Sequence, residues 1–251
     1  MTEETPHPNE PIDRGTPRES QLAPGVAPME TEAAATDSEG DLEPSHGIGP
    51  YPGGREAWPT DARYDKELLE HGDRRNVVDR YRYWRHEAIV ADLDTRRHGF
   101  HVAIENWAHD FNIGSVVRTA NAFMAREVHI VGRKRWNRRG AMVTDRYQHV
   151  RHHPTVEEFV AWAHGEVLAV IGIDNLPGSV PLETYALPRE CVLVFGQESV
   201  GLTDQVREAA DATLAIAQYG STRSINAGAA AAIAMHAWVG QHGDVAAGHE
   251  G

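Results

Sequence analysis

The sequence contains little of what marks secreted, membrane-spanning or metal-binding proteins. Cysteine occurs once in 251 residues, at Cys191 in the apolar run CVLVFG, so a disulfide framework and a cysteine-based zinc site are both excluded. We expect Cys191 to be a buried core residue. No apolar run reaches the roughly 18 residues that a membrane span needs, and the first residues lack the apolar segment of a signal peptide. These absences predict a cytoplasmic protein with no membrane partner.

Familiar phosphate and metal motifs are missing as well. The sequence has no G-x-G-x-x-G dinucleotide fingerprint and no glycine-rich loop that ends in G-K-[ST]. His149, His152 and His153 lie close together, but no Asp, Glu or Cys sits beside them at metal-ligand spacing. We therefore expect no metal site.

Composition divides the chain into unequal parts. Residues 1–60 are rich in Pro, Gly, Glu, Asp and Thr, and they cannot bury enough apolar surface to offset chain entropy, so we expect an acidic disordered tail. Residues 1–62 hold about −10 of the total charge of −13. The remainder is close to neutral, so the acidic total does not argue against a nucleic-acid partner. We expect a helical extension at 62–95, the main domain at 96–243 and a flexible C-terminus at 244–251.

Strand-like and helix-like segments alternate through the main domain. The expected strands are 99–106, 127–132, 167–173, 191–196 and 212–217. The expected helices are 112–125, 155–164, 203–210 and 224–240. This alternation predicts an α/β fold with a parallel sheet and helices on both faces. Ligands of such sheets bind beyond the carboxyl ends of the strands, where the helices begin.

A first motif, FNIGSVVRTANAF from Phe111, follows the first of these strands. Asn112 suits the N-cap of the next helix, and Gly114 admits a close backbone or ligand. Arg118 lies one turn into a helix of small and apolar residues. The stretch is compatible with a ligand site, and equally with a capped helix whose arginine extends into solvent.

Two further motifs follow later strands. LVFGQESVGLT, from Leu193, ends a strand at Gly196 and places Glu198 and Gly201 in a loop before a helix capped by Thr203. IAQYGSTRSINAGAAAAIAMHAW, from Ile216, leads from a strand into a helix of small residues, which predicts tight packing. Ser224 suits the N-cap of that helix, but one cap does not explain all the polar residues around it.

Basic and aromatic residues gather in two segments. Five of the seven residues at 133–139 are basic, and Trp136 lies among them: Arg133, Lys134, Arg135, Arg138 and Arg139. This basic loop favours RNA binding over a solvated loop, because clustered cations around an aromatic ring suit a phosphate backbone. Residues 81–85, YRYWR, suit RNA stacking and helix packing alike.

Together, the three motifs resemble those of the SpoU branch of the SPOUT RNA methyltransferases. The first family motif is matched by Asn112, Gly114, Arg118, Thr119 and Ala120. The second is matched by Gly196, Glu198 and Gly201. The third is matched by Ile216, Gly220, Ser224, Ile225 and Asn226. The order and spacing are those of the family, and the match covers about residues 99–240.

The resemblance implies a fold, a donor and a reaction. Family members have a parallel sheet with a C-terminal trefoil knot, usually form homodimers, and transfer a methyl group from S-adenosylmethionine to a ribose 2′-hydroxyl of rRNA or tRNA, without a metal. The implied donor-binding residues are Gly196, Gly201, Ile216, Ser224 and Ile225. The implied catalytic residues are Asn112, Arg118, Glu198, Ser224 and Asn226. The expected partners are RNA and a second copy of the chain, and not DNA.

Arg118 is the residue that the family scheme places at the hydroxyl. A guanidinium holds its proton above about pH 12, so we expect it to orient a phosphate and stabilise alkoxide charge, with Glu198 holding Arg118 or Asn112. Two departures, Ala-Gln-Tyr after Ile216 and Ala227-Gly228, stay compatible with donor binding. Two alternatives stay open: a knotted RNA-binding protein without catalysis, and an unrelated nucleotide-binding α/β enzyme.

Overall fold

A single parallel sheet organises the chain. The structure, a computed structural model, describes residues 47–107, 112–197 and 200–244. Residues 1–46 of the predicted acidic tail and nearly all of the predicted flexible C-terminus lie outside them, while residues 47–60 of that tail are described and include the 3-10 turn Arg55–Ala57. The seven strands have the order β3-β2-β1-β6-β4-β7-β5, and every pairing is parallel. They are β1 Phe100–Asn106, β2 Val128–Gly132, β3 Val150–His153, β4 Ala169–Ile173, β5 Val180–Pro181, β6 Cys191–Phe195 and β7 Ala212–Ala215. The predicted parallel sheet is confirmed, while the trefoil knot stays a prediction.

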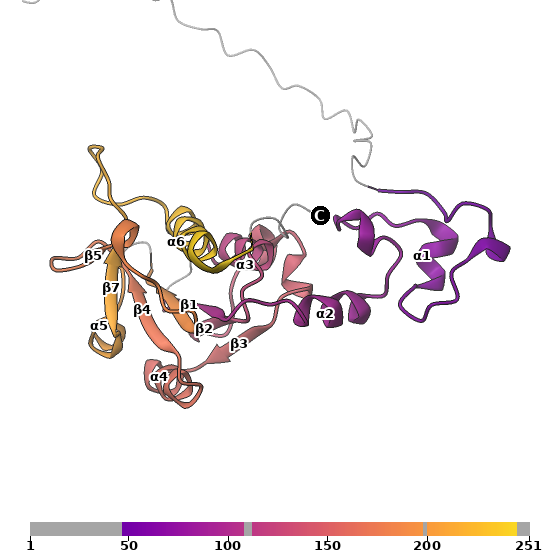
Figure 1. Cartoon of the computed structure of the whole chain (residues 1–251). Helices are drawn as coiled ribbons and strands as arrows, with labels where there is room; N and C mark the ends of the chain where they lie inside the picture. Colours follow the sequence, from indigo (N-terminus) through magenta and orange to yellow (C-terminus); the bar gives the residue numbers. More distant parts are fainter. Residues whose placement is uncertain (1–46, 108–111, 198–199, 245–251) are drawn as a thin grey trace, which may run out of the picture. The chain divides into compact units, whose positions relative to one another are not determined.

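Helices cover both faces of this sheet, as the alternation predicted. Figure 1 shows α3 (Ile113–Ala122) and α6 (Ala227–His242) together on one face, and α4 (Val156–Gly165) and α5 (Asp204–Ala209) on the other. Two shorter helices, α1 (Lys66–His71) and α2 (His86–Asp94), precede the sheet. No helix among the described residues is both long and apolar enough to cross a membrane.

The core is split by the sheet into two layers. On the α3 and α6 side, Phe100, Leu193 and Trp238 are almost fully buried, and on the α4 side Phe159 is the largest buried residue. Cys191 is buried, as predicted, and burial raises the pKa of its thiol to about 12. Its thiol is therefore protonated at neutral pH, and its role is packing.

Two strands differ from the sequence-based expectation, as do the end of α3, which falls at Ala122 rather than 125, and the start of the last helix. No strand was expected at residues 150–153, where β3 lies, or in the connection before Tyr185, which contains the short strand β5. Both lie at the edges of the sheet, and β3 carries polar and charged side chains, so an apolar pattern was absent. The last helix begins at Ala227 rather than at 224, because Asn226 and not Ser224 caps it.

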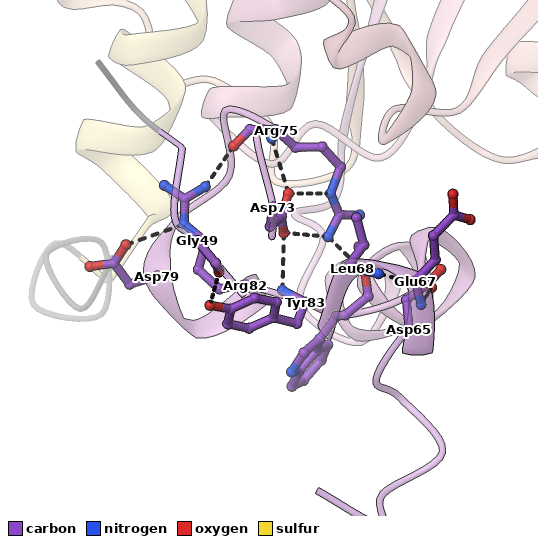
Figure 2. Close-up of polar contacts among 10 residues, drawn as sticks. Gly49, Asp65, Glu67, Leu68, Asp73, Arg75, Asp79, Arg82 and Tyr83 are labelled. Carbon is purple, nitrogen blue, oxygen red and sulfur yellow. Dashed lines mark hydrogen bonds and ion pairs between the residues drawn. The ribbon is translucent and has the colours of Figure 1, made fainter. Parts of the chain in front are cut away.

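The segment before the sheet is built around a buried ion pair. The Asp73 carboxylate accepts hydrogen bonds from the Arg75 side chain at 2.9 and 2.7 Å and from the backbone N–H of Tyr83 at 3.0 Å (Figure 2). Tyr81, Tyr83 and Trp84 are all more than nine-tenths buried. Their rings are covered by the protein and cannot stack on bases, so the packing interpretation of residues 81–85 is the right one.

Replacing Asp73 by Asn should destabilise this segment. Burial raises the pKa of Asp73, but its hydrogen bonds with Arg75 and Tyr83 outweigh that effect and hold the pKa below the ordinary 3.8. The stabilisation is fully present above pH 3.8 and is lost as the pH falls below it towards the lowered pKa. At neutral pH we expect Asp73→Asn to lower the free energy of unfolding by about 2–3 kcal/mol, measured by urea denaturation.

Asp79→Asn is the control for this substitution. Asp79 is almost fully exposed, so the free energy of unfolding should change by no more than about 0.5 kcal/mol. Equal losses in the two variants would contradict this role for the ion pair.

Three histidines form a buried row across neighbouring strands. His101, His129 and His153 come from β1, β2 and β3, and consecutive rings are joined by nitrogen pairs 3.0 Å apart. Burial, together with nearby arginines, lowers the pKa of His101 and of His153 to about 4. The rings are therefore neutral at physiological pH and share protons as donor and acceptor.

Candidate active site

The carboxyl ends of β4, β6 and β7 open onto one cavity. Its volume is about 400 Å³, which is in the range of small-molecule sites. Residues of the second and third motifs line it together: Gly196, Gly201, Ile216, Ser224, Ile225 and Asn226. All five predicted donor-binding residues thus share one cavity, although their role in binding stays a prediction.

The sequence did not identify the two cavity-lining residues that follow β4, Asp174 and Asn175. Asp174 and Asn175 line the cavity directly after the buried strand. The Asp174 carboxylate accepts a hydrogen bond from the backbone N–H of Leu202 at 2.9 Å, so it holds the end of the second motif. A polar pair directly after an apolar strand was the available signal, and no motif pointed to it.

The second motif folds back on itself through backbone contacts. The backbone N–H groups of Gln197 and Gly201 each donate to the carbonyl of the other, at 3.1 and 2.8 Å. A Cβ on Gly196 would overlap the backbone of Gly201, which itself has a φ of +75°. Glycine is therefore required at both positions, for close approach at one and for a left-handed backbone at the other. Glu198, the predicted acid of this motif, lies outside the described residues.

A buried carboxylate connects β1 with the end of the second motif. Glu105 is fully buried and accepts from the backbone N–H and the hydroxyl of Thr203, at 2.8 and 2.6 Å. Thr203 in turn caps α5 by accepting from the N–H of Val206, as its position in the sequence predicted. Glu105 was not recognised from the sequence, because a glutamate inside a strand has no motif to mark it.

The first and third motifs meet at the starts of α3 and α6. The Asn226 amide donates to the Asn112 side-chain oxygen at 3.0 Å, and Asn226 also accepts from the backbone N–H of Ala229. Asn112 stands at the N-cap position of α3, as expected, but its side chain makes no cap hydrogen bond there. The Asn112 oxygen instead joins two helices whose sequence positions differ by 114 residues.

Arg118 lies on the exposed face of α3. Asn112, Ser115 and Arg118 are spaced three residues apart, so they lie on one side of the helix, and both Ser115 and Arg118 are exposed. A Cβ on Gly228 would lie 3.6 Å from that of Ser115 and 3.7 Å from the Asn112 oxygen, so this side faces the start of α6. Among the described residues, Arg118 is not one of those that line the cavity; it lies on α3, six residues along the chain from Asn112.

The basic loop is fixed against the same helix. The Asn106 amide, at the carboxyl end of β1, donates to the backbone carbonyls of Arg133 and Arg135 at 2.7 and 2.9 Å. A Cβ on Gly114 would lie 2.8 Å from the Cα of Gly140, so Gly114 admits this backbone and not a ligand. All five predicted RNA-binding side chains are exposed: Arg133, Lys134, Arg135, Arg138 and Arg139. A basic surface therefore adjoins the start of α3.

A parallel α/β sheet with a cavity of this size at its carboxyl edge and a basic surface beside it defines a class: enzymes that bind a nucleotide-like small molecule and a polyanionic substrate. The particular family follows from the sequence. The chain belongs to the SpoU rRNA Methylase family, whose sequence model matches residues 99–236.

Known proteins of this family share sequence or fold with the chain. It is 25% identical over 155 residues to the tRNA (guanosine(18)-2'-O)-methyltransferase of Escherichia coli K12, covering 61% of this chain and 68% of that protein. The SpoU methyltransferase AviRb from Streptomyces viridochromogenes, solved with its cofactor AdoMet, superposes with a TM-score of 0.53 at 23% identity, covering 60% of each chain. The A. aeolicus TrmH/SpoU tRNA-modifying enzyme superposes with a TM-score of 0.56 at 19% identity, covering 62% of this chain and 81% of that one. At such identities these structures show the fold.

Proposed function

We propose that this protein is an RNA methyltransferase that transfers the methyl group of S-adenosylmethionine to a ribose 2′-hydroxyl of tRNA or rRNA. The observation that carries the proposal is the meeting of all three motifs: two line one cavity, and Asn226 of the third bonds Asn112 of the first. Family membership and the activity for which the E. coli relative is named support the reaction class.

The cavity fits S-adenosylmethionine in size and chemistry. Apolar side chains of Ile173, Phe195, Ile216 and Ile225 line it, and they suit an adenine ring. Asp174, Gln197 and Ser224 add polar groups for ribose hydroxyls and the amino-acid end. When bound, S-adenosylmethionine supplies a methyl group on a sulfonium, which is already an activated leaving group.

The residues around α3 orient the target ribose and stabilise the negative charge that develops on its 2′-oxygen. A guanidinium does not lose its proton near neutral pH, so Arg118 acts as a fixed cation that orients the phosphate beside the target ribose and stabilises alkoxide charge. The proton leaves to that phosphate or to water. Asn112 and Asn226 hold the starts of α3 and α6 together, and Ser224 orders the ribose. Glu198 holding Arg118 or Asn112 stays part of the proposal.

We further propose a cytoplasmic homodimer whose active site lies near the subunit interface, as the family resemblance implies. The basic loop, and not the aromatic residues 81–84, receives the RNA backbone, because its cations are exposed while those rings are buried. DNA is not expected as a substrate, because the reaction needs the 2′-hydroxyl.

The salt dependence of RNA binding tests the basic loop. Lys134→Ala with Arg135→Ala should weaken RNA binding and lower the slope of log affinity against log salt concentration by about 1–2, since each phosphate contact contributes roughly one unit. The control is Arg207→Ala on α5, an exposed arginine paired with Asp204. A slope unchanged in the double variant, or lowered equally by the control, would place the RNA elsewhere.

Two measurements separate the proposal from its alternatives. Calorimetry with S-adenosylmethionine should show one site per chain, whereas an unrelated nucleotide enzyme would bind none. Transfer of tritium from labelled S-adenosylmethionine to bulk RNA should then be catalytic. Donor binding without transfer to any RNA would favour the second candidate, a knotted RNA-binding protein that has lost catalysis.

A further inference from the structure

Away from the methyl-transfer site, three metal-ligating side chains face one another between β1 and β2. The Nδ1 of His101 lies 3.0 Å from the Nε2 of His129. That same Nε2 lies 3.7 Å from a carboxylate oxygen of Glu127. The three ligand atoms all lie within 4.8 Å of one another. No sequence motif marks this group, because His101 lies in β1, His129 in β2 and Glu127 just before β2.

We propose that His101, His129 and Glu127 form a binding site for a divalent transition-metal ion, with Zn²⁺ as the best-matched ion. Two imidazole nitrogens and one carboxylate are a donor set that Zn²⁺ favours. Zn²⁺ sits about 2.0–2.1 Å from a histidine nitrogen, so the two nitrogens, now 3.0 Å apart, separate by a few tenths of an ångström on binding. The nitrogens point at each other, with ring centroids 5.3 Å apart, so the His101 ring also turns to direct its lone pair at the ion. Glu127 is partly exposed and provides the path of entry.

The next shell of residues fits this assignment. The Nδ1 of His129 lies 3.0 Å from the Nε2 of His153, so His153 can accept its proton and fix the tautomer that leaves Nε2 for the metal. The ring of Trp162 stacks on His129 with centroids 3.9 Å apart and limits its movement. These contacts hold His129 in the tautomer and ring plane that leave its Nε2 for the ion, so the adjustment on binding falls on His101.

A second cavity next to these residues provides room and charge. Its volume is about 340 Å³, and His101, Glu127 and Trp162 are part of its lining. Three carboxylates, of Glu127, Glu166 and Glu190, line it against the guanidinium groups of Arg126 and Arg151. The net charge of the lining favours a cation, and the open volume admits a water molecule as a fourth ligand.

Metal binding requires one proton to move. Without an ion, a single proton lies between the Nδ1 of His101 and the Nε2 of His129, since both rings are neutral. Both of these nitrogens need a free lone pair to bind the ion. His101 therefore changes to the tautomer that carries its proton on Nε2, and the number of protons on the chain does not change. The ion would join β1 to β2 and stabilise the fold without touching the cavity of the three motifs.

Titration of the metal-free full-length protein with Zn²⁺ tests the site. We expect one tightly bound Zn²⁺ per chain and a rise in the melting temperature with Zn²⁺ concentration. Glu127→Gln should weaken binding by at least about tenfold, and His153→Gln by about 10–100-fold through the second shell. The matched control is Glu166→Gln, an exposed carboxylate of the same cavity, which should bind within about twofold of wild type.

Co²⁺ provides an independent readout, because its visible absorption is intense only in a four-coordinate site. The wild-type chain should show that band, and His101→Gln should abolish it. No stoichiometric Zn²⁺ binding by the wild-type protein would overturn the proposal. So would binding that Glu127→Gln leaves unchanged, since the chain has 15 histidines that bind Zn²⁺ weakly. The rate of methyl transfer should be the same in wild type and Glu127→Gln. A failure of the metal-site proposal can therefore be told apart from a failure of the proposed methyltransferase function.

Discussion

Arg118→Lys should lower the turnover number for RNA methylation by about 100-fold, the size of effect seen when one donor to a developing oxyanion is lost. The lysine keeps the charge but loses the planar fork that fixes a phosphate through two bonds. Affinity for S-adenosylmethionine should not change, because Arg118 is not among the described residues that line the cavity. Single-turnover methylation and calorimetry measure the two effects separately.

A second arginine serves as the control for this substitution. Arg139→Lys makes the same change on the basic loop, where Arg139 is exposed, and its turnover should stay within about twofold of wild type because a surface phosphate contact tolerates either cation. Wild-type turnover in Arg118→Lys would exclude the bidentate role. A parallel loss of donor affinity would instead place Arg118 in the donor site.

Gly196→Ala should lower the affinity for S-adenosylmethionine by at least about tenfold, a loss of about 1.4 kcal/mol of binding free energy. The added Cβ would overlap the backbone of Gly201 and the N–H of Leu202. Backbone atoms cannot rotate away, so the loop that forms one wall of the cavity has to shift. Isothermal titration calorimetry measures the loss, and circular dichroism should show that the sheet persists.

The third motif contains the matched control. Gly220→Ala adds the same methyl group to a loop of the same site, but a Cβ at Gly220 would meet nothing within 4 Å. Donor affinity in this variant should stay within about twofold of wild type. Equal losses of donor affinity in the two variants would mean that donor binding depends on the backbone flexibility of glycine and not on the close approach at Gly196. No loss in either variant would mean that this cavity is not the donor site.

The elements with a strong apolar pattern could be predicted from the sequence, and the edges of the sheet could not. All residues of β1 and β6 are buried. Their short apolar runs, each flanked by a glycine, identify them as strands of the sheet interior. β3 was missed because only His153 of its four residues is buried. Residues 81–84 were ambiguous because aromatic rings pack against helices and bases equally well, and only their burial decided between the two.

The candidate site was predictable where a motif marks it. Gly196, Ile216 and Ile225 line one cavity, as the resemblance implied. Asp174 and Glu105 were missed, because each makes its key contact with a residue far away in the sequence, Leu202 and Thr203. Asn112 takes the predicted N-cap position of α3, but its side-chain oxygen accepts from Asn226 at the start of another helix, a partner that local propensity does not reveal.

The position of the transferred methyl group tests the account most directly. Bulk tRNA and rRNA are incubated with the protein and S-adenosylmethionine that carries a deuterated methyl group, then digested to nucleosides and analysed by mass spectrometry. We expect deuterium in a 2′-O-methylated nucleoside with the wild-type protein, and no deuterium there when Arg118→Ala replaces it. Deuterium on a base, or none on any RNA although the donor binds, would contradict it.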